Sequence, residues 1–371
     1  MSTYFKNKTI LILSPQPWES LHISKHHYAK ELAKSNDVYF VPAPSRSLSI
    51  FSNTKEVEPR LWVLDYSIPA LYWFQFKLPL LYKALIKLLL PRALSSNSIK
   101  ADICFDFGCY NQYDSVSFIN AKCKIFFPVD DYNDLTPTSR GAGLVLSVST
   151  NIAEKFPKGV CHFINHGLSE KFEINAKMAL ANNLKWYKRD KIRVGYAGNI
   201  FLKYLDIELL KVLISEYPFI EFHFFGSLVF DTKNQVHLSW NVFLKESRNV
   251  ILHGILHSDD LVLIYEKMDA FLLCYKPDNV NYHGENSHKI LEYLSTGKAI
   301  LSSHISYYQK SDLLIMPPHQ GNNPMKELFS ILVNDLEKFN SIEKMNARRN
   351  FAIEYTYKNQ LSRIEKLINE G

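Results

Sequence analysis

The sequence lacks the marks of several protein classes. Its five cysteines are odd in number and include no Cys-x-x-Cys pair, so neither a disulfide framework nor a zinc ribbon is indicated, and we expect reduced, mostly buried thiols. No Gly-x-Gly-x-x-Gly follows the first apolar run, which argues against NAD or FAD. No Asp-x-Asp follows a predicted strand of the second half and no His or Cys cluster has ligand spacing, so we expect neither a metal nor another cofactor.

Strong charge of one sign is also missing. The formal net charge is only +6, and it is not interleaved with aromatics and glycine, so nucleic acid is not an expected partner. The apolar run near the N-terminus stops at Ser14, too short for a signal peptide, which predicts a protein that stays in the cytosol. The composition, 47% hydrophobic and 22% charged over 371 residues, fits a globular protein of two domains at roughly 150 residues each.

The chain has no long uncharged apolar run either. Its most apolar stretch, residues 68–92, is interrupted by Lys77, Lys83 and Lys87, whereas a spanning helix needs about 18 uncharged apolar residues. Aromatic and leucine side chains beside basic ones suit a segment that lies on an anionic membrane surface. A buried helix whose lysines reach solvent along its edge gives the same pattern. Residues 1–100 carry 13 basic and 6 acidic side chains, and this excess favours membrane contact.

Short apolar runs alternate with helical periodicity along the chain. The predicted strands of the first half are residues 8–14, 38–41, 103–107, 124–128, 143–148 and 161–164, with a helix at 24–34. Those of the second half are 192–197, 220–225, 250–253, 270–274 and 298–302, with helices near 205–216, 258–267 and 287–294. This alternation predicts two α/β domains with mostly parallel, doubly wound sheets, joined by a linker within 173–190 and followed by an amphipathic helix at 346–371.

The strongest local signal is the segment Glu285–Gly297. Asn286 or Ser287 can cap a helix through a side-chain oxygen, and Gly297 stands where a left-handed C-cap is wanted. The helix therefore begins just after a loop at the carboxyl edge of the sheet. A helix N-terminus at that edge offers unpaired N–H groups and positive potential, which suits a phosphate or a diphosphate.

Two charged residues of this helix fit such a ligand. Lys289 lies in the first turn, where it opposes the helix dipole unless a bound anion offsets the repulsion. Glu292 lies about one turn after the cap, where its carboxylate can accept hydrogen bonds from both hydroxyls of a ribose. A solvated Lys and Glu on an ordinary surface helix is the alternative interpretation.

The run Ser287-His-Lys-Ile-Leu-Glu-Tyr-Leu-Ser-Thr-Gly-Lys-Ala-Ile-Leu-Ser resembles the signature of GT-B glycosyltransferases, close to family 4 and related bacterial cell-surface polysaccharide enzymes. Three other segments of the second half are similar to the same family: Gly195–Ile200, Asn249–Leu261 beside the nucleotide base, and Met268–Tyr275. The first half resembles it only loosely, through Ser14–Trp18, Val129–Asp131 and Asn165–Leu168.

The resemblance implies an α/β, GT-B fold with two Rossmann-like doubly wound domains facing a cleft. Residues 1–175 would form the acceptor domain and 190–345 the nucleotide-sugar donor domain, while 346–371 would close the chain by packing back toward the first domain. The implied activity is transfer of a hexose-type sugar from a UDP- or GDP-sugar to a lipid-linked or growing cell-surface glycan. The implied place is the inner face of the cell membrane, with anionic lipid contacted through 68–92.

The resemblance also implies roles for individual residues. The donor would contact Gly198, Asn199, Leu256, Glu285, Asn286, Ser287, Lys289 and Glu292. Glu292 would bind the ribose, Ser287 and nearby amides the diphosphate, and Lys203 would neutralise the leaving group as it gains charge. Family 4 has two glutamates seven residues apart, but the same distance back from Glu292 reaches Gly284. The sugar-binding role of Glu285 therefore stays open, as does the choice between retention and inversion.

An inverting reaction would need a catalytic base. Asp130 and Asp131 follow a predicted strand at its carboxyl end, where one of them can act as that base or both can cap a turn. His26, His27 and His166 are more simply explained as packing or turn residues. Two other functions stay open: a nucleotide-sugar epimerase on the same fold, and a catalytically degenerate subunit that binds nucleotide or glycan within a polysaccharide assembly.

Overall fold

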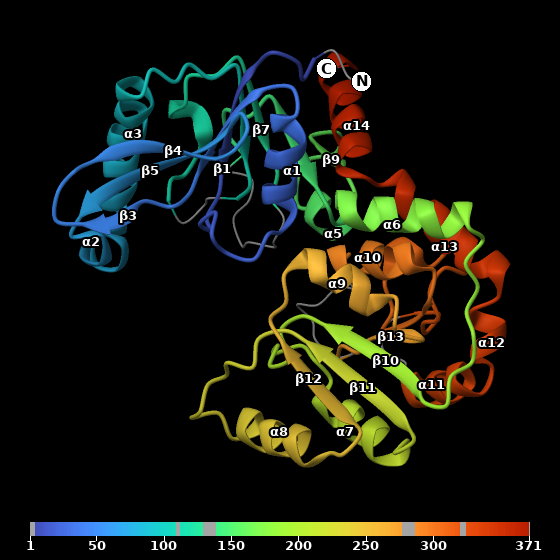
Figure 1. Cartoon of the computed structure of the whole chain (residues 1–371). Coiled ribbons are helices and arrows are strands. Elements are labelled where there is room, and N and C mark those ends of the chain that lie inside the picture. Colours follow the sequence, from blue (N-terminus) through green and yellow to red (C-terminus); the bar gives the residue numbers. More distant parts are fainter. Residues whose placement is uncertain (1–3, 109–111, 129–138, 277–285, 320–323, 371) are drawn as a thin grey trace. The chain divides into compact units, whose positions relative to one another are not determined.

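The computed structural model describes residues 4–108, 112–128, 139–276, 286–319 and 324–370. The chain forms two compact units, each built on its own sheet (Figure 1). Unit 1 consists of Met1–Gly167 together with Tyr357–Gly371, and unit 2 consists of Leu168–Thr356. The division falls at Gly167 rather than at residue 175. The reason is that helix α6 (Glu170–Ala181) buries Phe172 in the core of unit 2, where we expected the start of a linker.

Unit 1 has a nine-stranded sheet of order β3-β5-β2-β1-β6-β7-β8-β9, with β4 antiparallel to β5 and the other pairs parallel. Its strands are β1 (Thr9–Leu13), β2 (Asp37–Val41), β3 (Ser45–Ser47), β4 (Ser52–Glu58), β5 (Leu61–Pro69), β6 (Ile103–Asp106), β7 (Cys123–Phe126), β8 (Leu144–Ser147) and β9 (Cys161–Phe163). Its helices are α1 (Ser24–Ala33), α2 (Leu71–Lys77), α3 (Pro79–Ser96), η1 (Val116–Phe118), α5 (Thr150–Ala153) and α14 (Tyr357–Glu370).

Helices cover both faces of this sheet. Tyr28 of α1 and Leu361 of α14 pack with one set of buried strand residues, whereas Ile86 of α3 packs with the other set. Central strand β1 is consequently apolar on both faces, as parallel strands between two helix layers are. Stretch 68–92 folds as the end of β5 followed by α2 and α3.

Unit 2 has a five-stranded, wholly parallel sheet of order β12-β11-β10-β13-β14. Its strands are β10 (Ile192–Ala197), β11 (Ile220–Phe225), β12 (Val250–Gly254), β13 (Ala270–Leu273) and β14 (Ala299–Ser302). Its remaining helices are α7 (Ile207–Glu216), α8 (Gln235–Glu246), α9 (Ser258–Tyr265), α10 (His288–Thr296), η2 (Ser306–Tyr308), α11 (Met325–Asn334), α12 (Leu336–Phe339) and α13 (Ile342–Glu354).

The end of the chain forms two helices rather than one. α13 belongs to unit 2 and α14 to unit 1, and the break between them lies at Tyr355 and Thr356. There the Leu168 N–H donates to the Tyr355 carbonyl at 2.7 Å, so the two crossings between the units run side by side. Among the residues that the structure describes, no helix is both long enough and apolar enough to cross a membrane.

Candidate functional site

The order of the second sheet reverses at β10. The chain runs outward from β10 through β11 to β12 and then returns to place β13 on the other side of β10. β10 pairs with β11 from Ile192 to Ala197, but its ladder with β13 holds only Val194 and Gly195. In parallel α/β sheets, ligands bind beyond the carboxyl ends of the strands at such a reversal.

Tyr293 of α10 fills the place where β10 and β13 part. Its hydroxyl accepts the Ala197 N–H at 2.8 Å, a donor that the shortened ladder leaves without a strand partner. The ring also stacks on Phe271 of β13, with the ring centroids 4.1 Å apart. Tyr293 thus fixes α10 against the carboxyl end of β10.

Glycines line the carboxyl ends of three neighbouring strands. Gly198 follows β10, Gly226 follows β11 and Gly254 ends β12. The Gly198 N–H donates to the Phe225 carbonyl at 2.7 Å, and the Gly226 N–H donates to the Gly254 carbonyl at 2.8 Å. A Cβ at Gly226 would overlap the Gly198 carbonyl oxygen, so only glycine fits there. The edge therefore presents bare backbone, which a phosphate can approach closely.

Lys289 of α10 lies against this glycine edge. A Cβ at Gly198, where φ is +136°, would overlap the Lys289 ammonium, and that ammonium also lies 5.7 Å from the centroid of the Tyr196 ring. Among the described residues, Lys289 forms no ion pair. The structure thus joins two of the predicted donor residues, 91 positions apart in sequence, and one of them is a cation that forms no ion pair within the described ranges.

The N-terminus of α10 has no side-chain cap from its N-cap residue, Ser287. Ser287 has the extended backbone of an N-cap, with φ −88° and ψ 134°, yet its hydroxyl makes no capping hydrogen bond. Of the two capping residues that the sequence offered, Asn286 and Ser287, the second therefore does not cap the helix through its side chain, whereas Gly297 is the left-handed C-cap that the sequence predicted. The positive end of the helix and the Lys289 ammonium together favour an anion.

Two buried arginines hold the other end of α10. Arg349 Nη2 donates to the Thr296 carbonyl at 3.0 Å, and Arg348 Nη1 donates to the Gly297 carbonyl at 3.0 Å. These bonds place positive charge at the negative end of the helix. Burial lowers the pKa of Arg348 to about 10, so the guanidinium stays charged at neutral pH. Both arginines come from α13, and no local sequence pattern predicted that they would bond the end of α10.

Glu292 is a half-buried carboxyl one turn into α10. Burial raises its pKa to about 7, against a partial offset from nearby Lys289. Within the described residues its carboxylate accepts no hydrogen bond. Its charge contributes to the raised pKa values of nearby Tyr265 and Tyr293. A partner with two hydroxyl donors would stabilise the charged form, as the predicted ribose role requires.

The predicted residues after β10 and β12 have separate environments. Asn199 is exposed, and its side-chain oxygen accepts the Phe201 N–H at 2.9 Å, so it shapes the turn. Lys203 is exposed and, in the part of the chain that the structure describes, has no ion pair. Its segment folds over the end of β13, where the Lys276 N–H donates to the Tyr204 carbonyl at 2.9 Å. Leu256 packs against the core of unit 2.

Three predicted residues, Asp130, Asp131 and Glu285, lie outside the described residues. Asn286 is described and buried directly before α10. In unit 1, burial lowers the pKa of His26 to about 4, and its Nε2 lies 3.2 Å from the Pro17 carbonyl oxygen, which fits a packing role. Across the described ranges, no group of three or more His, Cys, Asp or Glu side chains could hold a metal ion.

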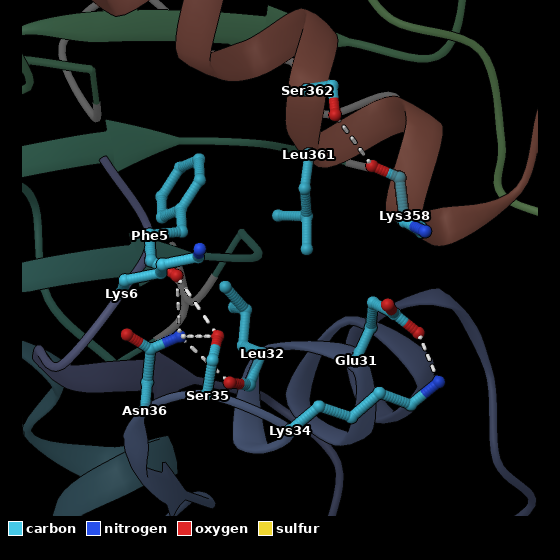
Figure 2. Close-up of a pocket in the computed structure, with 10 residues that line it drawn as sticks. All are labelled: Phe5, Lys6, Glu31, Leu32, Lys34, Ser35, Asn36, Lys358, Leu361 and Ser362. Carbon is cyan, nitrogen blue, oxygen red and sulfur yellow. Dashed lines mark hydrogen bonds and ion pairs between the residues drawn. The ribbon is translucent and has the colours of Figure 1, made fainter. Parts of the chain in front are cut away.

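A pocket of about 100 Å³ lies elsewhere, in unit 1 among the start of the chain, α1 and α14 (Figure 2). Its polar groups pair with one another: the Asn36 amide donates to the Phe5 and Leu32 carbonyls, and Lys34 pairs with Glu31 (Figure 2). The pocket borders the amino ends of β1 and β2, away from the carboxyl edge of that sheet. We interpret it as the seam where α14 packs on α1.

Comparison with known proteins bears on the fold. No protein-family model matches the sequence, and no curated protein is similar to it in sequence. Solved structures are similar over nearly their whole length. Sucrose-phosphate synthase from Thermosynechococcus elongatus has a TM-score of 0.66 at 11% identity, covering 98% of this chain and 99% of that one. HepE from Anabaena, in complex with UDP and glucose, has a TM-score of 0.64 at 10% identity, covering 98% and 100%.

A glycosyltransferase from Rickettsia africae has a TM-score of 0.62 at 13% identity, covering 98% of each chain. The chain has the GT-B fold. This confirms the fold that the resemblance implied, and at these identities it establishes the fold alone. Of the two Rossmann-like units of this fold, the C-terminal one, unit 2, carries the edge formed by Gly198, Lys289 and Glu292. Sequence reasoning missed Gly226, although Phe224-Phe-Gly226 has the same strand-then-glycine pattern as Ala197-Gly198.

Proposed function

We propose that the protein is a nucleotide-sugar-dependent glycosyltransferase. It transfers a hexose-type sugar from a UDP- or GDP-sugar to a lipid-linked or growing cell-surface glycan, at the inner face of the cell membrane. The observation that carries the donor half is the arrangement at α10. A helix N-terminus that Ser287 does not cap through its side chain, and the Lys289 ammonium, adjoin the bare backbone of Gly198. The carboxyl of Glu292 lies one turn further on, and within the described residues neither charged group has an ion pair.

In this proposal the donor diphosphate lies between the start of α10 and the glycine edge. Lys289 and the first-turn N–H groups offset its charge, and Glu292 accepts the ribose hydroxyls. Breaking the glycosidic bond leaves the sugar electrophilic and puts the bonding electron pair on the departing phosphate oxygen. Exposed Lys203, on the loop after β10, supplies a second cation for that growing charge. Because these groups already supply positive charge, we expect transfer to continue in EDTA without a metal ion.

The structural neighbours support the choice of donor. HepE was solved with UDP and glucose, and another neighbour, from E. coli, was solved with UDP-2-fluoro glucose at a TM-score of 0.64 and 10% identity. The acceptor half of the proposal rests on the basic, apolar stretch at 68–92 and on the resemblance to polysaccharide enzymes. It is therefore independent of the α10 geometry.

A panel of UDP- and GDP-sugars, incubated with the purified protein and a membrane lipid extract, tests the proposal. We expect release of UDP or GDP that requires the extract, together with a labelled sugar in the lipid or glycan fraction. An isomerised nucleotide-sugar formed without the extract would replace the proposal by an epimerase. Nucleotide binding without any release from any donor would replace it by a binding subunit.

A further inference from the structure

Helix α3 of unit 1 carries large apolar side chains on its solvent side as well as on its inner face. Its inner face buries Tyr82, Ile86 and Leu90 in the core. Its outer face exposes Leu80 by 81% and Leu88 by 48%, where a surface helix normally carries polar side chains. Exposed leucines on the solvent side of a surface helix mark an interaction site when they form part of a larger apolar patch.

Two neighbouring elements extend this apolar face. α2, which packs against both α3 and β3, exposes Trp73 by 59% and Phe76 by 62%. The loop from β3 to β4 exposes Leu48 and Ile50, and all three elements lie at one end of unit 1 (Figure 1). We call these exposed side chains the α2–α3 surface: Leu48, Ile50, Trp73, Phe76, Leu80 and Leu88.

The β3–β4 loop is held in place by Ser67 of β5. The Ser67 hydroxyl donates to the Ser49 carbonyl at 2.7 Å and accepts the Phe51 N–H at 3.0 Å. The Ser67 N–H in turn donates to the Phe51 carbonyl at 3.1 Å. The exposure of Leu48 and Ile50 is therefore built into the fold, because backbone hydrogen bonds fix the loop that carries them.

The chain segment that forms most of the α2–α3 surface is basic. From Tyr66 to Ala101 the sequence contains no Asp or Glu and five Lys or Arg. Lys83 and Lys87 both pair with Asp114, at 2.5 and 3.2 Å. Lys77 and Arg92 are exposed and, within the ranges that the structure describes, form no ion pair. The apolar surface is thus bordered by two cations whose charge is free to meet an anion.

We propose that the α2–α3 surface binds the headgroup and upper acyl region of an anionic phospholipid bilayer. Trp73, Phe76 and Leu80 enter the acyl boundary, while Lys77 and Arg92 contact lipid phosphates. A second copy of the chain fits less well, because a two-fold contact would bring the same unpaired cations toward each other. The inference deepens the proposed function by placing its lipid-linked acceptor, and in that sense rests on it.

The experiment measures co-sedimentation of the full chain with vesicles of phosphatidylglycerol and phosphatidylcholine, and with phosphatidylcholine alone. We expect binding that needs phosphatidylglycerol and weakens in high salt. Phe76→Ser should weaken binding about tenfold, from the lost apolar burial. Its matched control is Phe219→Ser in unit 2, where the exposed fraction is 57% and binding should not change. Lys77→Gln should weaken binding about fivefold, and Lys233→Gln should leave it unchanged.

Equal binding by Phe76→Ser and Phe219→Ser would overturn the inference, as would the absence of binding to anionic vesicles. A lipid-free dimer that Phe76→Ser dissociates would also overturn it, in favour of a second copy on this surface. Both phenylalanines are exposed, so matched thermal midpoints serve as the folding check. No donor is present in the vesicle assay, so its failure stays distinct from a failure to release UDP or GDP.

Discussion

The two Rossmann-like units place similar elements at the carboxyl edges of their sheets and equip them differently. In unit 2 three neighbouring strands end in or lead into glycine, and Lys289 at the start of α10 forms no ion pair among the described residues. In unit 1 helix α1, which follows the first strand, begins among side chains that bond one another: Lys25 with Gln16, and Ser24 with His166 at 3.4 Å. Lys25 is also almost fully buried, with 1% exposure.

This difference shows what makes a sheet edge able to hold a phosphate. Both units place a lysine in the first turn of a helix, but in unit 1 that lysine already has a hydrogen-bond acceptor and no route to solvent. In unit 2 the lysine is next to bare backbone and needs an anion from outside. The four predictions below test this contrast, in order of decreasing expected effect.

The largest effect is expected from the arginines that hold α10. Arg348→Met leaves the carbonyls of Leu313, Phe339 and Gly297 without their donor. We expect the free energy of unfolding to fall by about 3 kcal/mol, because buried carbonyls lose charge-assisted bonds. Chemical denaturation measures this. The control in unit 1 is Lys30→Met in the last turn of α1, which loses one exposed ion pair to Glu58 and should cost under about 1 kcal/mol.

The second prediction concerns the glycine edge. Gly226→Ala forces the Gly198 carbonyl to move, so UDP or GDP affinity should fall about a hundredfold while the fold persists. Gly143→Ala in unit 1 is the control, because its Cβ would lie 3.9 Å from the Lys124 carbonyl oxygen, an ordinary contact. Isothermal titration of both variants measures the change. Unchanged affinity in Gly226→Ala would mean that the nucleotide does not use this edge.

Removing the cation at α10 should have a smaller effect. Lys289→Met should weaken nucleotide binding about thirtyfold and slightly raise the melting temperature of the free protein, since a lysine in the first turn opposes the helix dipole. Exposed Lys245 in the last turn of α8 provides the control Lys245→Met, which should leave affinity unchanged. Thermal shift with and without nucleotide gives both quantities. A lower melting temperature for Lys289→Met without nucleotide would show a structural role instead.

The smallest effect is a pH dependence from Glu292. Its pKa is raised from 4.5 to about 7, so the folded protein holds a proton that the unfolded chain releases, and the stability from this proton is lost as pH rises from about 4.5 to 7. If the charged form binds the ribose hydroxyls, affinity should rise about tenfold between pH 6 and 8. Titrations across that range should give a flat profile for Glu292→Gln and the wild-type slope for the control Glu208→Gln on α7. A flat wild-type profile would remove Glu292 from the nucleotide site.

Local patterns predicted much of the fold. The strand at 192–197 and the C-cap Gly297 are where the sequence put them, because both depend on near neighbours in the chain. α6 was missed because Asn175 lies between the buried positions Phe172 and Ala176, and Asn182 and Asn183 follow the helix. These polar residues hide the helical spacing of the apolar side chains.

Long-range contacts were beyond the reach of local patterns. The arginines of α13 reach α10 across more than 50 positions, and Lys289 meets Gly198 across 91 positions. The resemblance implied donor contacts for Lys289 and Gly198 separately. Their contact with each other depends on β10 and β13 lying side by side.

The most direct test of the central claim is a crystal structure with the nucleoside diphosphate that gives the largest thermal shift. The account predicts the diphosphate at the start of α10, with a phosphate oxygen about 3 Å from Lys289 Nζ and from first-turn N–H groups, and the ribose hydroxyls on Glu292. A nucleotide bound with its phosphates at another sheet edge, leaving Lys289 and Gly198 without contact, would contradict it.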